Sequence, residues 1–253
     1  DLLDNSIDGA NKISPNDYSN LFIELTINDT EFSIRDNCGG FSLETAQKYA
    51  FRFGRPEEAP KVKNTVGRFG IGMKRSLFKI GKYFVVESES QQDHFKVEVN
   101  VDEWSKKTRQ VVVNGNQNTT IDDWSFNYEI INEDSQGYKG TYIHVTELNN
   151  EVKDLFADDS FLSDLVESIQ KLLNFSLLKG ITITLNGRKL IGQKNELLFS
   201  DSHKPYYAEG FLGDVKYRII AGLGEIGEPK KSGWYVYCNN ILILEADSSN
   251  ITG

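Results

Sequence analysis

The chain has 253 residues, enough for one large domain or two modest ones with cores of their own. Hydrophobic residues make up 39% and charged residues 26% of the sequence, an ordinary globular balance, and no apolar run is long enough to cross a bilayer. The net charge of −9 gives no general support for nucleic-acid binding. Cys38 and Cys238 stand in no metal-ligand spacing, so we expect reduced thiols in a cytoplasmic protein, or a nuclear one in a eukaryote.

The first ten residues predict an amphipathic helix, and we expect the chain, which begins inside this pattern without a methionine, to be a piece of a longer protein. Asp1, Asn5 and Asp8 recur at intervals of four and three residues, which places them on a common polar face. An amide oxygen one turn from a carboxylate suits a divalent cation and the water beside it. A solvated helix face with acid near its N-terminus has the same pattern.

Two strands are predicted at residues 21–27 and 31–35, and they lead into Asp36, followed by a glycine corner at Gly39 and Gly40. A carboxylate at this strand end can accept a hydrogen bond from an exocyclic amine such as that of adenine. Gly40 would let a flat base lie against the backbone. A simple Asp-Asn turn explains the same residues equally well.

A helix is predicted at 42–50 with Ser42 as its N-cap, and a glycine-rich stretch follows at 67–74. Its glycines at 67, 70 and 72 let main-chain N–H groups approach a bulky anion, and the helix that follows adds the positive end of its dipole. The stretch therefore predicts a phosphate site, although such glycines also open loops for steric reasons alone. The irregular segment 51–66 before it has the character of a mobile lid.

The remainder alternates strand and helix signals. Strands are predicted at 83–88, 94–101, 110–113, 124–130 and 141–146, which together describe a largely antiparallel sheet. One long amphipathic helix is predicted at 161–178 with Gly180 as its C-cap, then a hairpin around Asn186-Gly187 and further strands near 206–211, 216–221 and 234–244. We expect an α+β fold with helices on one face of a mixed, mostly antiparallel sheet in a domain at 1–155, followed by a smaller, incomplete α+β unit at 156–253.

Four of these signals occur in an order that resembles the ATP-site motifs of the GHKL superfamily, which includes gyrase, the heat-shock chaperone, histidine kinases and MutL. They are Asp1-x-x-x-Asn5, Asp36-x-Cys38-x-Gly40, Gly67-x-x-Gly70-x-Gly72 and Gly140-Thr141. The resemblance covers about residues 1–150 and is greatest to MORC-type ATPases and their prokaryotic relatives, through the stretches 51–54, 65–76 and 237–243. It implies the Bergerat ATP-binding fold followed by a transducer-like domain.

The resemblance also implies roles for individual residues. Asn5 would hold Mg²⁺, Asp36 would bind the adenine amine, Thr141 would join the hydrogen bonds on the adenine side, and Asp1 stands where the family's catalytic Glu activates water. Further nucleotide contacts are implied for Asp8, Gly40, Gly67, Arg68, Phe69, Gly70, Ile71, Gly72, Met73 and Lys74.

Two departures from the family pattern bear on activity. Asp1 is one methylene shorter than Glu, and a misplaced water can cost on the order of a hundredfold in rate, so we expect slow hydrolysis. Cys38 replaces the first glycine of the second motif. The implied function is a Mg²⁺-dependent ATPase whose lid closure drives homodimerisation, a clamp acting on DNA or a protein client and not on a membrane.

Two alternatives stay open from the sequence. A module that binds ATP without hydrolysing it would be a nucleotide sensor. A histidine-kinase-type phosphotransferase is disfavoured by the continuous half after residue 160 and because His94, His144 and His203 stand in strand or loop patterns.

Overall fold

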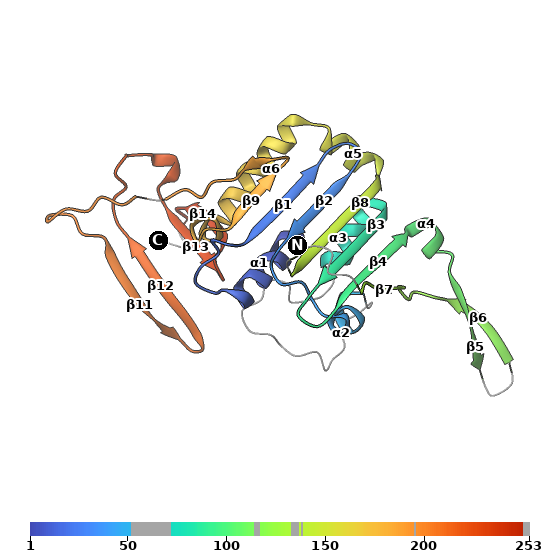
Figure 1. Ribbon diagram of the computed structural model, residues 1–253. Helices are drawn as coiled ribbons and strands as arrows, with labels where there is room; N and C mark the ends of the chain where they lie inside the picture. The colour runs from blue at the N-terminus through green and yellow to red at the C-terminus, as the bar shows by residue number, and fades with distance from the viewer. Residues whose placement is uncertain (52–71, 114–116, 133–136, 138, 195, 250–253) are drawn as a thin grey trace.

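The computed structural model describes residues 1–51, 72–113, 117–132, 137, 139–194 and 196–249. Its largest feature is one sheet made of β1 (Phe22–Ile27), β2 (Phe32–Asp36), β3 (Gly81–Glu89), β4 (His94–Asn100), β7 (Glu129–Ile130), β8 (Gly140–Leu148), β9 (Thr182–Leu185) and β10 (Arg188–Lys189). The spatial order is β10-β9-β1-β2-β8-β3-β4-β7, and only the pair β1–β9 is parallel among these strands (Figure 1). The predicted mixed, mostly antiparallel α+β fold is confirmed.

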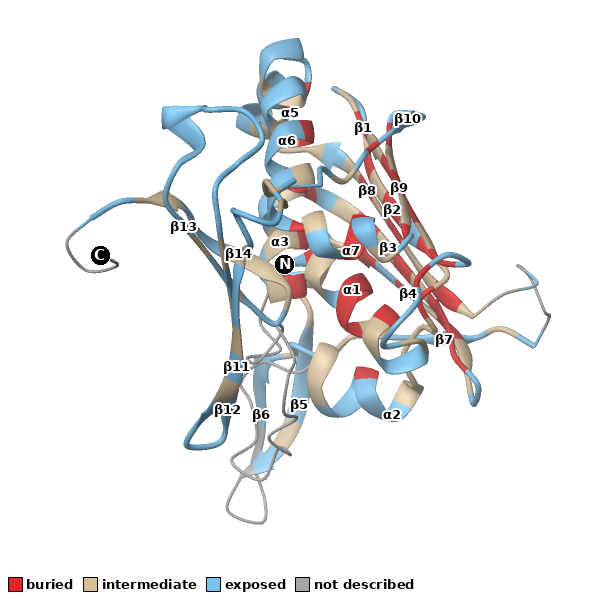
Figure 2. Cartoon of the chain, turned by 90° about the vertical axis from the view of Figure 1, so that its left-hand side faces the viewer, coloured by how far each residue is buried: buried red, intermediate tan, exposed pale blue. Residues whose placement is uncertain are grey.

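Helices cover one face of this sheet, as Figure 2 shows. They are α1 (Leu2–Ile13), α2 (Leu43–Thr45), the π-helix η1 (Ala46–Ala50), α3 (Gly72–Ile80), α5 (Asn150–Phe156), α6 (Asp159–Leu172) and α7 (Asn174–Leu178), with the short α4 (Val101–Trp104) after β4. The predicted N-cap of α2 is confirmed, because the Ser42 hydroxyl accepts the backbone N–H of Thr45 at 3.2 Å.

The hydrophobic core lies between the sheet and these helices. Alternate residues of the strands point into it, as the two-residue period of a strand requires. Fully buried examples are Ile23, Phe84, Val86, Phe95, Val145 and Ile183, which meet Ile7, Ala10 and Leu77 from the helices. Polar pairs occupy the opposite face, including Glu87 with His94 and Glu31 with His144.

The sheet continues past the expected domain boundary at residues 155 and 156. Strand β9 pairs with β1, and the helices α5 to α7 form the crossover between the two parts of the sheet. Val166, Ile169 and Ile183 bury their side chains in the same core cluster as Ile7. The expected hairpin after α7 is confirmed, with Asn186 and Gly187 both at positive φ, but it closes the first sheet instead of opening a second unit.

The single helix predicted at 161–178 is two helices. The chain breaks at Leu173, where φ is −102° and ψ is 20°. Next to the break, the Asn174 side chain donates to the Gln193 carbonyl at 2.9 Å and accepts the Gln193 N–H at 2.7 Å. These bonds hold the returning chain against the start of α7, a contact that helical periodicity cannot show.

Beyond residue 192 the described chain forms two hairpins, β11–β12 (Tyr206–Leu212 and Val215–Ala221) and β13–β14 (Trp234–Cys238 and Ile241–Asp247). The strand expected at 234–244 is this second hairpin, because Asn239 and Asn240 both adopt positive φ and form its two-residue turn. The ring of Tyr237 meets that of Phe175 at 4.4 Å, so β13–β14 packs on the helix layer.

A third hairpin, β5–β6 (Thr108–Val113 and Gln117–Asp122), projects from the sheet edge, away from β11–β12 (Figure 1). The sequence did not predict β6. The strand expected at 124–130 is wrong over most of its length, because only Glu129–Ile130 pairs, with β4. Residues 124–128 instead run beneath η1.

Replacing Ile183 on β9 tests whether this strand belongs to the first core. Ile183 is fully buried there, so Ile183→Ala should lower the free energy of unfolding by about 2–5 kcal/mol in urea titrations. Ile243→Ala, at a position that is 59% exposed on β14, is the matched control and should cost no more than about 0.5 kcal/mol. Equal effects of the two changes would contradict this assignment of β9.

Candidate functional site

The site is centred on Asp36, the last residue of β2, whose side chain is only 4% exposed. One carboxylate oxygen, Oδ2, accepts the Ser6 hydroxyl of α1 at 2.7 Å. The other, Oδ1, accepts the backbone N–H of Cys38 at 2.8 Å and that of Thr141 at 3.3 Å. A carboxylate has about four acceptor positions, so these three donors leave room for one more.

Burial raises the pKa of Asp36 above its ordinary value, and the hydrogen bonds from Ser6, Cys38 and Thr141 oppose this shift. The carboxylate is therefore held in place by donors from α1, from the turn after β2 and from β8. An amine donor that entered the site would add to the stabilisation of the charged form.

Two glycines allow the backbones around Asp36 to approach. A Cβ on Gly140 would lie 1.8 Å from the Asp36 carbonyl oxygen, and one on Gly9 of α1 would lie 2.4 Å from that of Cys38. Any side chain at either position would push α1 or β8 away from the end of β2. Gly140 was singled out in the sequence as part of the Gly140-Thr141 motif, whereas no role was predicted for Gly9.

The reason expected for Gly40, close approach of a flat base, differs from what the structure shows. Gly40 has a φ of +57°, and a Cβ there would meet the carbonyl oxygens of Glu89 at 2.3 Å and Gly140 at 2.8 Å. The space beside Gly40 is thus filled by the ends of β3 and β8. The glycine is required by this backbone contact and by its left-handed conformation.

The three residues predicted to share the polar face of α1 differ in their exposure. Asp1 and Asn5 are exposed, whereas Asp8 is buried at 8% exposure. A merely solvated face would expose all three. Asp1 is the N-cap of α1, but its carboxylate makes no capping bond to the helix N–H groups.

Asp1 lies beside the start of α3. A Cβ on Gly72 would come within 3.0 Å of the Asp1 side-chain carbon Cγ, so a larger residue there would require this carboxylate to move by a few tenths of an ångström. The structure thereby brings the candidate base next to the third glycine of the predicted phosphate stretch. Gly67, Arg68, Phe69, Gly70 and Ile71 lie outside the described residues, as does the expected lid apart from Phe51.

Met73 and Lys74, both predicted to contact nucleotide, are buried in the first turn of α3. Met73 belongs to the hydrophobic core cluster. The Lys74 ammonium donates to the carbonyls of Ala50 at 2.8 Å and Tyr49 at 3.1 Å, and burial lowers its pKa to about 8. Lys74 therefore joins α3 to the end of η1, a contact that the sequence analysis did not predict.

Ser6 is the residue of this site that sequence reasoning missed. Its signal was its place in α1, directly after Asn5 and on the face that β2 meets. Within the described ranges no group of three or more His, Cys, Asp or Glu side chains is arranged to hold a metal ion. Among the helices described, none is long and apolar enough to cross a membrane.

The structure thus places a buried carboxylate, that of Asp36, against the middle of α1, and the Asp1 carboxylate beside the start of α3. A family model described as "Histidine kinase-, DNA gyrase B-, and HSP90-like ATPase" matches residues 1–137. The match covers more than half of the sequence, and the chain belongs to this ATPase family.

Comparison with solved structures finds the crystal structure of the 43K ATPase domain of Thermus thermophilus gyrase B in complex with an aminocoumarin. The two chains are 16% identical with a TM-score of 0.43, over 86% of this chain and 54% of the gyrase chain. The chain therefore spans about half the length of that ATPase domain. None of the curated proteins matches the sequence.

Replacing Asp36 by Asn measures how much the buried charge lowers the free energy of unfolding. A pKa raised on folding contributes stability that is complete below the unfolded pKa, about 3.9, and is lost as pH rises through the folded pKa. Asn carries no charge and keeps an acceptor for the two N–H groups. We expect Asp36→Asn to be at least as stable as the wild type at pH 7 in urea unfolding, with any gain disappearing near pH 4.

The exposed Asp29→Asn is the control and should show no such pH-dependent difference. A large loss of stability in Asp36→Asn at pH 7 would contradict the view that the charged carboxylate is kept at a cost to folding.

Proposed function

We propose that the chain binds ATP with Mg²⁺ and hydrolyses it slowly. The observation that carries this proposal is the Asp36 carboxylate, which is buried and held by three donors with one acceptor position left. The exocyclic amine of adenine is a donor of the required kind. Membership of the ATPase family supports ATP as the ligand.

The residues around Asp1 fit a Mg²⁺-bound phosphate chain. Mg²⁺ prefers oxygen ligands and retains several waters, and it neutralises phosphate charge when bound. Asn5 offers an exposed amide oxygen one turn from the Asp1 carboxylate, and the start of α3 at Gly72 adds the positive end of a helix dipole. We assign Asn5 as the protein ligand of the metal and Asp1 as the group that orients and deprotonates the attacking water.

The wider role is proposed as that of a MORC- or MutL-like clamp. ATP binding would favour a homodimer, provided that ATP binds the dimerising conformation more tightly than the other. The clamp would act on DNA or on a protein client. The net charge of −9 favours a protein client, because an acidic surface does not attract phosphate backbones.

A sensor that binds ATP without cleaving it is the second candidate. The observation that favours it is the length of Asp1, whose carboxylate stands one methylene behind that of a Glu at the same position. A fixed water is then farther from its best geometry, and the chemical step suffers while binding does not.

Removal of the Asn5 side chain tests the metal ligand. Asn5→Ala should weaken binding of Mg·ATP at least about tenfold in calorimetric titrations, because one charge-assisted contact is lost. The affinity for ATP in EDTA should be the same for both proteins. Asn16→Ala, an exposed change outside α1, is the control. An equal loss with and without Mg²⁺ would exclude Asn5 as the metal ligand.

Changes at Asp1 distinguish the slow ATPase from the sensor. We expect Asp1→Glu to raise the rate of phosphate release, by up to about a hundredfold, and Asp1→Asn to abolish it, both with ATP affinity nearly unchanged. The measurement is steady-state phosphate release with Mg·ATP. Wild-type and Asp1→Asn proteins that both bind ATP and release no phosphate would favour the sensor.

A further inference from the structure

A hollow lies beside α2 and η1, among residues other than those of the proposed nucleotide site. It has a volume of about 330 Å³, at the lower end of the ~300–1,000 Å³ of small-molecule pockets. It shares no residue with the site around Asp36 and Asp1. The lining residues are Leu43, Ala46, Gln47, Phe51, Val97, Trp124, Ser125, Phe126 and Tyr128.

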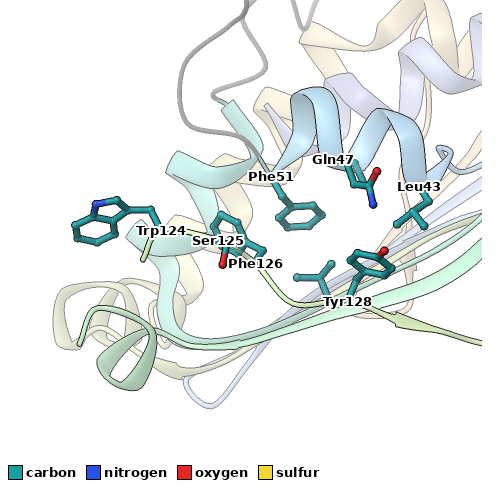
Figure 3. A pocket seen from close by; sticks show the side chains of 9 residues that line it. Leu43, Gln47, Phe51, Trp124, Ser125, Phe126 and Tyr128 are labelled. Carbon is teal, nitrogen blue, oxygen red and sulfur yellow. The ribbon is translucent and has the colours of Figure 1, made fainter. Parts of the chain in front are cut away.

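One wall of this hollow is the helical turn of α2 and η1, and the facing wall is the segment 124–128 (Figure 3). Trp104 holds the facing wall, since its ring lies 5.2 Å from Trp124 and stacks on Phe126 at 5.1 Å. Its indole N–H also donates to the Ser125 carbonyl at 3.0 Å. The Phe51 ring lies 5.2 Å from that of Phe126, which links the two walls.

The side chains that line this hollow determine what kind of ligand it can bind. None of the nine lining residues has a charged side chain, so phosphates, carboxylates and ammonium groups would find no partner among them. Aromatic rings from Phe51, Phe126 and Tyr128 line the hollow, and aromatic rings pack favourably against one another. The Gln47 amide and the Tyr128 hydroxyl supply isolated hydrogen-bonding groups. We propose that this pocket binds a small, uncharged aromatic molecule and thereby regulates the nucleotide site.

A succession of hydrogen bonds links the two sites. Phe51 is the C-cap residue of η1, and its N–H bonds to the Ala46 carbonyl at 2.9 Å. The two preceding carbonyls, of Tyr49 and Ala50, accept the Lys74 ammonium. Lys74 belongs to the first turn of α3, which begins at Gly72 beside Asp1. A ligand that shifts Phe51 therefore acts on the groups that position α3, and this regulatory part depends on the proposed ATP function.

The test uses p-cresol as the probe, an aromatic ring with one hydroxyl that is uncharged at pH 7. Wild-type protein should bind it in ligand-observed NMR and calorimetric titrations. Gln47→Trp and Ser125→Trp, which fill the hollow from opposite walls, should each weaken binding at least about tenfold. Lys48→Trp is the matched control, since Lys48 is the exposed neighbour of Gln47 and does not line the pocket.

Failure of the wild type to bind p-cresol, or equal binding by all four proteins, would overturn the assignment of this hollow as a small-molecule pocket. The hollow would then be a place that a side chain from another protein segment fills. Saturating Mg·ATP should change the p-cresol affinity about fivefold or more. Independent binding of the two ligands would overturn the regulation. If p-cresol binds as expected but ATP does not bind when titrated alone, the proposed nucleotide function fails and the pocket remains.

Discussion

Burial of the Asp36 carboxylate is the constraint on which the rest of this site depends. A charge removed from water must be surrounded by donors, and here the donors come from α1, from the turn after β2 and from β8. The three segments can reach the carboxylate only because Gly9 and Gly140 let their backbones approach. The position of α1 on the sheet is therefore coupled to the ability of Asp36 to accept one further donor.

The same helix carries the other end of the site. Ser6 meets Asp36, while Asp1 lies beside Gly72 at the start of α3, about 7.5 Å away along the axis of α1 at 1.5 Å per residue. One rigid element thus sets the spacing between the Asp36 carboxylate and the Asp1 carboxylate, the two ends of the proposed nucleotide site. Lys74 adds a link from α3 to η1 and so connects the phosphate end to the aromatic pocket at Phe51.

The sequence predicted those structural features that depend on residues close together in the chain. The stripe of α1, the Ser42 cap and the Asn186-Gly187 turn each follow from a few neighbouring residues. The misses depend on contacts between distant segments. Asn174 bonds to Gln193 and divides a helix, and β9 pairs with β1 across the expected domain boundary. The Asn239-Asn240 turn was a local signal that could have been found.

In the proposed function Asp36 selects a base by accepting its amine, and a comparison of purine nucleotides tests this selection. Adenine carries an amine donor at position 6, whereas guanine carries a carbonyl acceptor there, which a buried carboxylate would repel. Calorimetric titration of the wild-type chain with Mg·ATP and with Mg·GTP should show binding of ATP and at least about a hundredfold weaker binding of GTP. Equal affinities for the two nucleotides would contradict the account.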